Sequence, residues 1–142
     1  MGTNNKNIVI TSAVRTAIGT FRGSLKDMQA KDLGALVTKA AMQKSNLDSN
    51  DIDELIMGQV LTGAAGQNPA RQAAIQAGIS IEKTAYVINQ VCGSGLRSVA
   101  AGYQAIMSND SKIIIAGGQE SMTNAPHAIY LRNGKKFDES NL

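Results

Sequence analysis

The residue with the clearest capacity for chemistry is Cys92, the only cysteine of the 142-residue sequence. It follows a β-rich segment, 84–91, and precedes a helical pattern that opens with Gly93, Ser94 and Gly95. Open parallel α/β sheets bind ligands at the carboxyl ends of their strands, which is where this spacing puts the thiol. The partial positive charge of a helix N-terminus stabilises a thiolate, the nucleophilic form of cysteine. The pattern indicates covalent catalysis; the alternative is an inert, buried cysteine that only fills space.

The residues after Cys92 favour the catalytic interpretation. Gly93 and Gly95 lack side chains, which predicts access for a thioester and close packing of the helix against another backbone. The amides that follow the nucleophile are expected to be free to bind a developing oxyanion. A single cysteine excludes an internal disulfide and a multi-cysteine metal site within one copy of the chain. We therefore predict a reduced, cytoplasmic location and no metal site.

Alternating strand and helix patterns surround the cysteine and would position it. Short β-branched runs predict four strands, at residues 7–14, 52–60, 84–91 and 112–116. Helical spacing and capping residues predict helices over 31–44, from Pro69 to just before Gly78, and from 92–95 to Met107. The last helix carries an apolar stripe made of Leu96, Val99, Ala100, Tyr103, Ile106 and Met107.

This order of elements predicts the α/β class, with a mostly parallel sheet covered by helices on both faces. The alternating pattern fails after Gly118, where a polar segment follows. We predict one incomplete αβα domain over residues 1–118 and the start of a truncated loop region over residues 119–142.

Composition excludes several classes of partner. The formal net charge is +3, but the basic residues are scattered, so nucleic acid is not an expected ligand, whereas a phosphate-bearing small molecule is permitted. No apolar run approaches the length of a membrane span, and the first residues lack an export signal, so no membrane partner is expected.

Residues 89–98, Asn-Gln-Val-Cys-Gly-Ser-Gly-Leu-Arg-Ser, closely resemble the nucleophile motif of the thiolase family. Three further blocks resemble thiolase signatures in the same order along the chain, at residues 15–19, 66–73 and 116–127. Together the four blocks extend over nearly the whole sequence. The resemblance implies a thiolase-type αβα layered fold, of which this chain would be the amino-terminal half, with the Cys92 helix buried between neighbouring layers.

The resemblance also implies an activity. The matching cysteine of thiolases takes an acyl group from an acyl-CoA, and the expected reaction is the reversible Claisen condensation of two acetyl-CoA to acetoacetyl-CoA plus CoA through an acyl-cysteine intermediate. Coenzyme A would be substrate and product, with no prosthetic group and no metal. Acetyl-CoA and acetoacetyl-CoA are the implied partners, and a homodimer or homotetramer is the implied assembly.

The sequence departs from the family pattern in one respect. Thiolases also use a histidine that activates the nucleophile and a second cysteine that acts as acid and base, and neither can be assigned here. His127 matches a loop residue and is expected to be structural or surface-exposed. Arg71 and Arg97 could contact an anionic CoA, but structural or dimer contacts are the expectation for both, so Cys92 is the one catalytic residue that we assign.

Three alternatives remain open at this point. A degradative 3-ketoacyl-CoA thiolase would use the same nucleophile on longer chains, although Gly93, Leu96 and Arg97 favour the acetoacetyl-CoA type. A decarboxylating ketoacyl synthase shares the strand-cysteine-helix device but surrounds its cysteine with a different motif. The isolated chain could also be an inactive half-domain that only binds or dimerises, because its apolar surface would lack a partner layer.

Overall fold

The computed structural model describes residues 7–128 and has the α/β class that the sequence predicts. Along the chain it contains α1 (Ala30–Ser45), β1 (Glu54–Gly58), α2 (Pro69–Ala77), β2 (Thr84–Ile88), α3 (Ser94–Met107) and β3 (Ile114–Gly118). Single 3₁₀ turns lie at Ser49–Asp51 and Met122–Asn124. None of the helices in the described part of the chain is both long and apolar enough to cross a bilayer.

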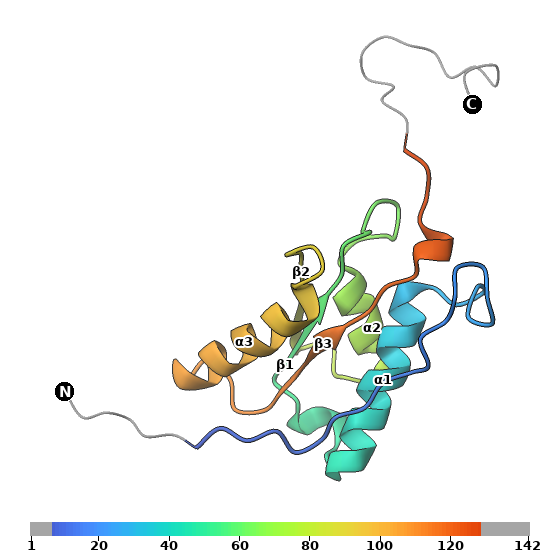
Figure 1. The fold of residues 1–142 in the computed structure, drawn as a ribbon. Helices are drawn as coiled ribbons and strands as arrows, with labels where there is room; N and C mark the ends of the chain where they lie inside the picture. Colours follow the sequence, from blue (N-terminus) through green and yellow to red (C-terminus); the bar gives the residue numbers. More distant parts are fainter. Residues whose placement is uncertain (1–6, 129–142) are drawn as a thin grey trace, which may run out of the picture.

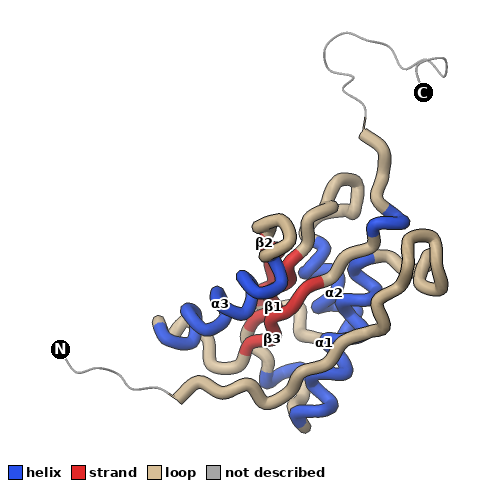
Figure 2. Tube along the Cα trace, in the orientation of Figure 1, coloured by secondary structure: helices blue, strands red, loops and turns tan. Residues whose placement is uncertain are grey.

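The three strands form a parallel sheet in the order β2-β1-β3, so β1 is central (Figures 1 and 2). Helices α1 and α2 cover one face of the sheet and α3 covers the other, which gives three layers (Figure 1). Leu55 and Met57 belong to the core cluster formed with α1 and α2. Ile56, between them in the strand, points to the opposite face and is fully buried as well.

Capping residues define α2 as the sequence predicts. The Asn68 side chain accepts a hydrogen bond from the Arg71 amide at 3.1 Å, and Pro69 takes the first helical position, where its missing N–H leaves no donor unpaired. Gly78 ends the helix with φ of 96°, a left-handed conformation that glycine adopts without a Cβ penalty. The helix predicted over 31–44 is confirmed as α1.

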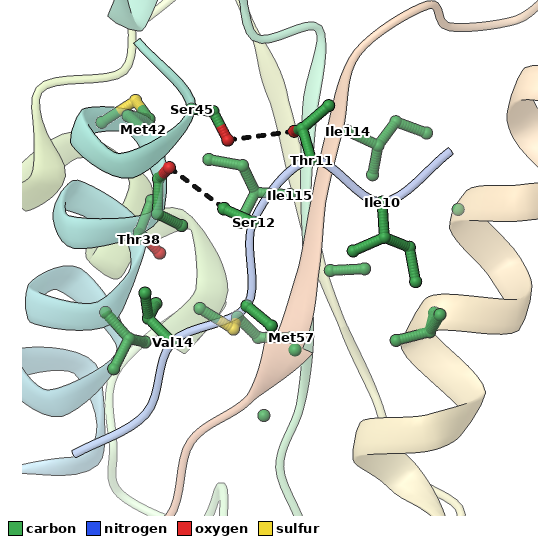
Figure 3. Close-up of a pocket in the computed structure, with 18 of the residues that line it drawn as sticks. Ile10, Thr11, Ser12, Val14, Thr38, Met42, Ser45, Met57, Ile114 and Ile115 are labelled. Atoms are coloured by element: carbon green, nitrogen blue, oxygen red, sulfur yellow. Dashed lines mark hydrogen bonds between the residues drawn. The ribbon is translucent and has the colours of Figure 1, made fainter. Parts of the chain in front are cut away.

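Residues 7–14, predicted to be the first strand, do not form one. They run beside α1, where the Ser12 hydroxyl donates to the Ala41 carbonyl and the Lys44 ammonium donates to the Ala13 carbonyl, both at 3.1 Å. A cavity of about 600 Å³ is lined both by this segment and by β3, and residues 7–14 pair with no strand of the sheet (Figure 3). A strand needs a hydrogen-bonded neighbour, and β-branched residues alone do not supply one.

Two strand ends differ from their predictions for reasons of packing. The third predicted strand, 84–91, stays in the sheet only to Ile88, because β1 pairs with β2 no further than the Gly58–Ile88 register. In β3 the predicted closing glycines, Gly117 and Gly118, lie inside the strand. A Cβ at Gly118 would lie 3.5 Å from the Gly95 Cα, an ordinary packing distance, so the end of β3 lies in contact with the start of α3.

Helix α3 packs on the sheet with a face that the apolar stripe does not predict. Its buried residues are Ser94, Ser98 and Gly102, one turn apart, whose small side chains permit a close approach to β1 and β3. The stripe points elsewhere, and Leu96 and Tyr103 are 78% and 54% exposed. Among the residues described, the helix is therefore covered on one side only. The sheet is one of the two neighbouring layers that the resemblance implies, and no second layer covers the other face of the helix in this part of the chain.

The domain boundary predicted at residue 118 stays a prediction. Beyond it, the Asn124 side chain donates to the carbonyls of Lys26 and Met28, so the segment after β3 contacts the loop before α1. Residues 129–142 of the predicted loop region lie outside the described residues.

Asp53 links the starts of β1 and β3 and gives a prediction about stability. Its carboxylate accepts hydrogen bonds from the amides of Lys112 and Ile113, at 2.8 and 3.1 Å, and lies 3.3 Å from the Lys83 ammonium. These two backbone amides hold the pKa of Asp53 below its usual value, with the Lys83 contact adding to the effect. The carboxylate thus stabilises the fold above the pKa of an unfolded aspartate, about 3.9, and that contribution is lost as the pH falls through the lower folded pKa.

We expect Asp53→Asn to lower the free energy of unfolding at pH 7 by about 1 kcal/mol, a value reduced by the partial exposure of the side chain. The difference from the unsubstituted chain should shrink towards pH 3, as measured by urea unfolding across pH. Asp27→Asn, at an exposed aspartate in the turn before α1, is the control. A deficit that is independent of pH would contradict this role for the Asp53 charge.

Candidate active site

Cys92 lies in a tight turn between β2 and α3, at the carboxyl end of the sheet, and its thiol is exposed. The sequence correctly predicts that Cys92 lies between a strand and a helix, but the predicted strand and helix leave too few residues for the connecting turn. The strand ends at Ile88 and the helix begins at Ser94, with Gly93 as its N-cap, so Cys92 lies just outside the helix. The thiol is thus presented to solvent by a turn next to a helix N-terminus, an arrangement that suits a nucleophile.

The residue before the cysteine has an unusual backbone conformation. Val91 has φ of 50°, in the left-handed region that β-branched residues rarely occupy. Holding such a residue costs about 1–3 kcal/mol, and strained residues of this kind concentrate at functional sites. The turn consequently depends on other contacts to keep its shape.

Two side chains supply those contacts. The Ser94 hydroxyl accepts from the Gln90 amide at 2.8 Å and donates to the Val91 carbonyl at 2.6 Å. The Asn89 carboxamide oxygen accepts from the Val91 amide at 3.0 Å. Each bond contributes about 0.5–1.5 kcal/mol, so the three together are comparable to the strain at Val91. Sequence reasoning missed both side chains, although an asparagine two residues before a bend is a recognised turn signal.

The amides after the cysteine are less available than the sequence suggests. The Gly93 amide donates to the Gln90 carbonyl at 3.0 Å, and the Ser94 amide donates to the Val91 carbonyl at 3.1 Å. Both close the turn that carries the thiol. The expectation that they are free to bind an oxyanion is therefore wrong for these two groups in the chain as described.

Close packing behind the turn requires a glycine that sequence reasoning did not single out. A Cβ on Gly58, the last residue of β1, would lie 2.4 Å from the Ser94 carbonyl carbon and 2.5 Å from the Gly95 nitrogen. A Cβ on Gly95 would meet nothing within 4 Å. The helix approaches another backbone as predicted, but Gly58 on the sheet, and not Gly95 on the helix, makes the approach possible.

A second strand end is tied to the same region by a carboxylate. Glu120 accepts hydrogen bonds from the amides of Val60 and Leu61, at 2.8 and 3.2 Å, which fixes the loop after β1. The Asn89 side chain donates to the Val60 carbonyl at 3.3 Å and so joins this loop to the turn of Cys92. The loops that follow all three strands are thereby linked at the edge of the sheet where the thiol lies.

The other residues considered from the sequence lie away from this chemistry. The Arg71 guanidinium donates to the carbonyls of Ile81 and Lys83, so it has the structural role expected of it. Arg97 is exposed on α3, and His127 is exposed on the segment after β3. The histidine makes no hydrogen bond with the turn of Cys92 among the residues described. The cavity of about 600 Å³ beside residues 8–16 does not include Cys92 in its lining (Figure 3).

Comparison with known proteins is consistent with these features. A family described as "Thiolase, N-terminal domain" matches residues 8–142. The chain is 51% identical over 136 residues to an acetyl-CoA acetyltransferase of Rhizobium meliloti, covering 96% of this chain and 35% of the relative. It is 52% identical over 124 residues to an acetyl-CoA acetyltransferase of Escherichia coli, covering 87% of this chain and 32% of the relative.

A solved structure has the same fold. The Acat5 thiolase from Ascaris suum, crystallised in complex with coenzyme A, superposes with a TM-score of 0.83 at 44% sequence identity, covering 85% of this chain and 32% of that one. The chain thus spans about a third of the length of the relatives that it matches. On the match over residues 8–142, this chain belongs to the thiolase family and carries its N-terminal domain.

Proposed function

We propose that Cys92 is the acyl-accepting nucleophile of an acetyl-CoA C-acetyltransferase that condenses two acetyl-CoA to acetoacetyl-CoA plus CoA, reversibly. The observation that supports this most directly is the exposed thiol on a strained turn beside a helix N-terminus, in a chain about half identical to acetyl-CoA acetyltransferases. The solved relative in complex with coenzyme A supports a CoA thioester as the substrate class.

The chemistry proceeds in two steps. In the first, the Cys92 thiolate attacks the carbonyl carbon of acetyl-CoA, the bond to the CoA sulfur breaks, and CoA leaves as a thiol after gaining a proton. In the second, another acetyl-CoA loses a methyl proton, its carbanion attacks the acetyl-cysteine, and the Cys92 thiolate is released with acetoacetyl-CoA. The proton transfers need an acid and a base beyond Cys92, which the family resemblance assigns to a histidine and a second cysteine.

This function can be tested in a fusion protein, defined as residues 1–142 of this chain joined to the part of the Rhizobium meliloti relative that follows its matched segment. We expect the fusion protein to cleave acetoacetyl-CoA with added CoA, as measured by the loss of acetoacetyl-CoA absorbance. The homodimer or homotetramer that the resemblance implies belongs to the same proposal and is measured by light scattering.

Substrate comparisons separate the proposed reaction from its alternatives. Faster cleavage of long-chain 3-ketoacyl-CoA than of acetoacetyl-CoA would favour the degradative thiolase. Turnover of malonyl thioesters with release of carbon dioxide would favour a ketoacyl synthase. A folded fusion protein with no activity on any of these substrates would contradict the proposal.

A further inference from the structure

One buried serine closes the turn of Cys92 from its inner side. Ser94 is 4% exposed, and its hydroxyl bonds both to the Gln90 amide, at 2.8 Å, and to the Val91 carbonyl, at 2.6 Å. These two backbone groups lie immediately before Cys92, and Ser94 follows it by two residues. The hydroxyl therefore bridges the turn from one side of the cysteine to the other.

The thiol itself has little that would fix its direction. Among the described residues, the Cys92 side chain is exposed and makes no hydrogen bond. Its position follows from the backbone of the turn, where Val91 holds a φ of 50°. A valine released from that constraint would return to the negative φ values that β-branched residues prefer, and the cysteine next to it would move.

A second serine on the same helix provides a contrast. Ser98, one turn further along α3, is fully buried and has its hydroxyl 2.6 Å from the Gly95 carbonyl and 2.7 Å from the Gly117 carbonyl. It resembles Ser94 in burial and in the number of close oxygen or nitrogen partners, but its partners belong to α3 and β3. The two serines therefore differ in one respect that matters here, namely contact with the turn of Cys92.

We propose that Ser94 is a positioning residue for Cys92: its hydroxyl holds the left-handed Val91 turn and so keeps the thiol in the orientation needed to attack an acyl-CoA. The inference rests on the proposed role of Cys92 as nucleophile. It assigns to Ser94 no contact with substrate.

The test compares Ser94→Ala with Ser98→Ala in the fusion protein. We expect Ser94→Ala to lower kcat for acetoacetyl-CoA cleavage by about 10- to 100-fold, because small displacements of a reacting group have effects of this size. KM should change by less than about twofold, since the serine makes no contact with substrate. Ser98→Ala should keep kcat within about threefold, even where it lowers the melting temperature as much as Ser94→Ala does.

A rescue variant adds a readout that general destabilisation would not produce. Asparagine adopts the left-handed conformation more readily than other non-glycine residues, so Val91→Asn should restore part of kcat in the Ser94→Ala protein. Ser94→Thr, which keeps a hydroxyl, should also retain more activity than Ser94→Ala. If Ser94→Ala does not fold, Asn89→Ala releases the same turn from its exposed side and should show the same loss of kcat.

The outcomes separate the two proposals. Equal kcat values for the Ser94→Ala and Ser98→Ala proteins would overturn the role of Ser94 and leave the role of Cys92 intact. If Asn89→Ala is used because Ser94→Ala does not fold, an unchanged kcat in Asn89→Ala would have the same meaning. An inactive unsubstituted fusion protein would instead refute the proposed function. In that case the role of Ser94 is tested in the 142-residue chain by the rate at which iodoacetamide alkylates Cys92. Equal alkylation rates in the Ser94→Ala and Ser98→Ala variants would overturn the inference.

Discussion

Replacing Gly58 by alanine is expected to cause a large loss of stability and to displace the turn that carries Cys92. The new methyl group would lie 2.4 Å from the Ser94 carbonyl carbon and 2.5 Å from the Gly95 nitrogen, distances that no packed carbon atom tolerates. Both neighbours are backbone atoms, so no side-chain rotation relieves the clash. Either β1 or the first turn of α3 must move, and overpacking of this kind costs about 1–3 kcal/mol or more.

Urea unfolding of Gly58→Ala measures the loss in the free energy of unfolding, and the rate of Cys92 alkylation by iodoacetamide measures the displacement of the turn. Gly63→Ala is the matched control, because a Cβ at that loop glycine meets nothing within 4 Å. We expect the control to resemble the unsubstituted chain in both measurements. Stability and alkylation rates that are the same in Gly58→Ala and Gly63→Ala would show that α3 does not pack on β1 as closely as described.

Replacing Cys92 by serine is expected to remove activity from the fusion protein while leaving its fold intact. A hydroxyl is ionised far less readily than a thiol near neutral pH and is the weaker nucleophile, so the acyl-enzyme cannot form at a useful rate. Removal of a nucleophile costs on the order of 10³-fold or more in kcat. The exposed position of Cys92 means that the substitution disturbs no buried contact.

Loss of acetoacetyl-CoA cleavage is measured in the Cys92→Ser fusion protein beside Ser98→Ala, with circular dichroism and thermal unfolding to show that both variants fold. A folded Cys92→Ser protein that retains more than about a tenth of the activity would contradict the role of the thiol, since the expected loss is far larger.

Local signals in the sequence predicted much of the fold correctly. Asn68, Pro69 and Gly78 predict the bounds of α2 because capping depends on the residues at each end and not on distant contacts. The parallel sheet followed from alternating apolar strands and helices, and the position of Cys92 at the end of a strand followed from the same alternation.

Features that depend on distant neighbours could not be predicted in this way. The run at residues 7–14 has strand composition, but a strand also needs a paired edge, and a cavity lies between this segment and β3 (Figure 3). The apolar stripe of α3 does not mark the face that packs on the sheet, because the close approach of two backbones at Gly58 selects the face with Ser94 and Ser98. Periodicity reports how apolar a face is, not which neighbour comes near it.

The candidate site could likewise be predicted only in part. The sequence identified Cys92 and its place beside a helix, but not the turn that holds it. The left-handed Val91 and the bonds from Ser94 and Asn89 arise from backbone geometry between residues 89 and 94, which residue types alone leave open.

The most direct test of the central claim is the intact mass of the fusion protein after mixing with acetyl-CoA, with Cys92→Ser as control. We expect a gain of about 42 Da, the mass added by one acetyl group, and peptide mapping of the same sample should place it on the peptide that contains Cys92 and on no other. The gain should be absent from the Cys92→Ser protein and should disappear from the unsubstituted protein when CoA is added in excess. A folded fusion protein that gains no acetyl group, or gains one at another residue, would show that Cys92 is not the acyl-accepting nucleophile.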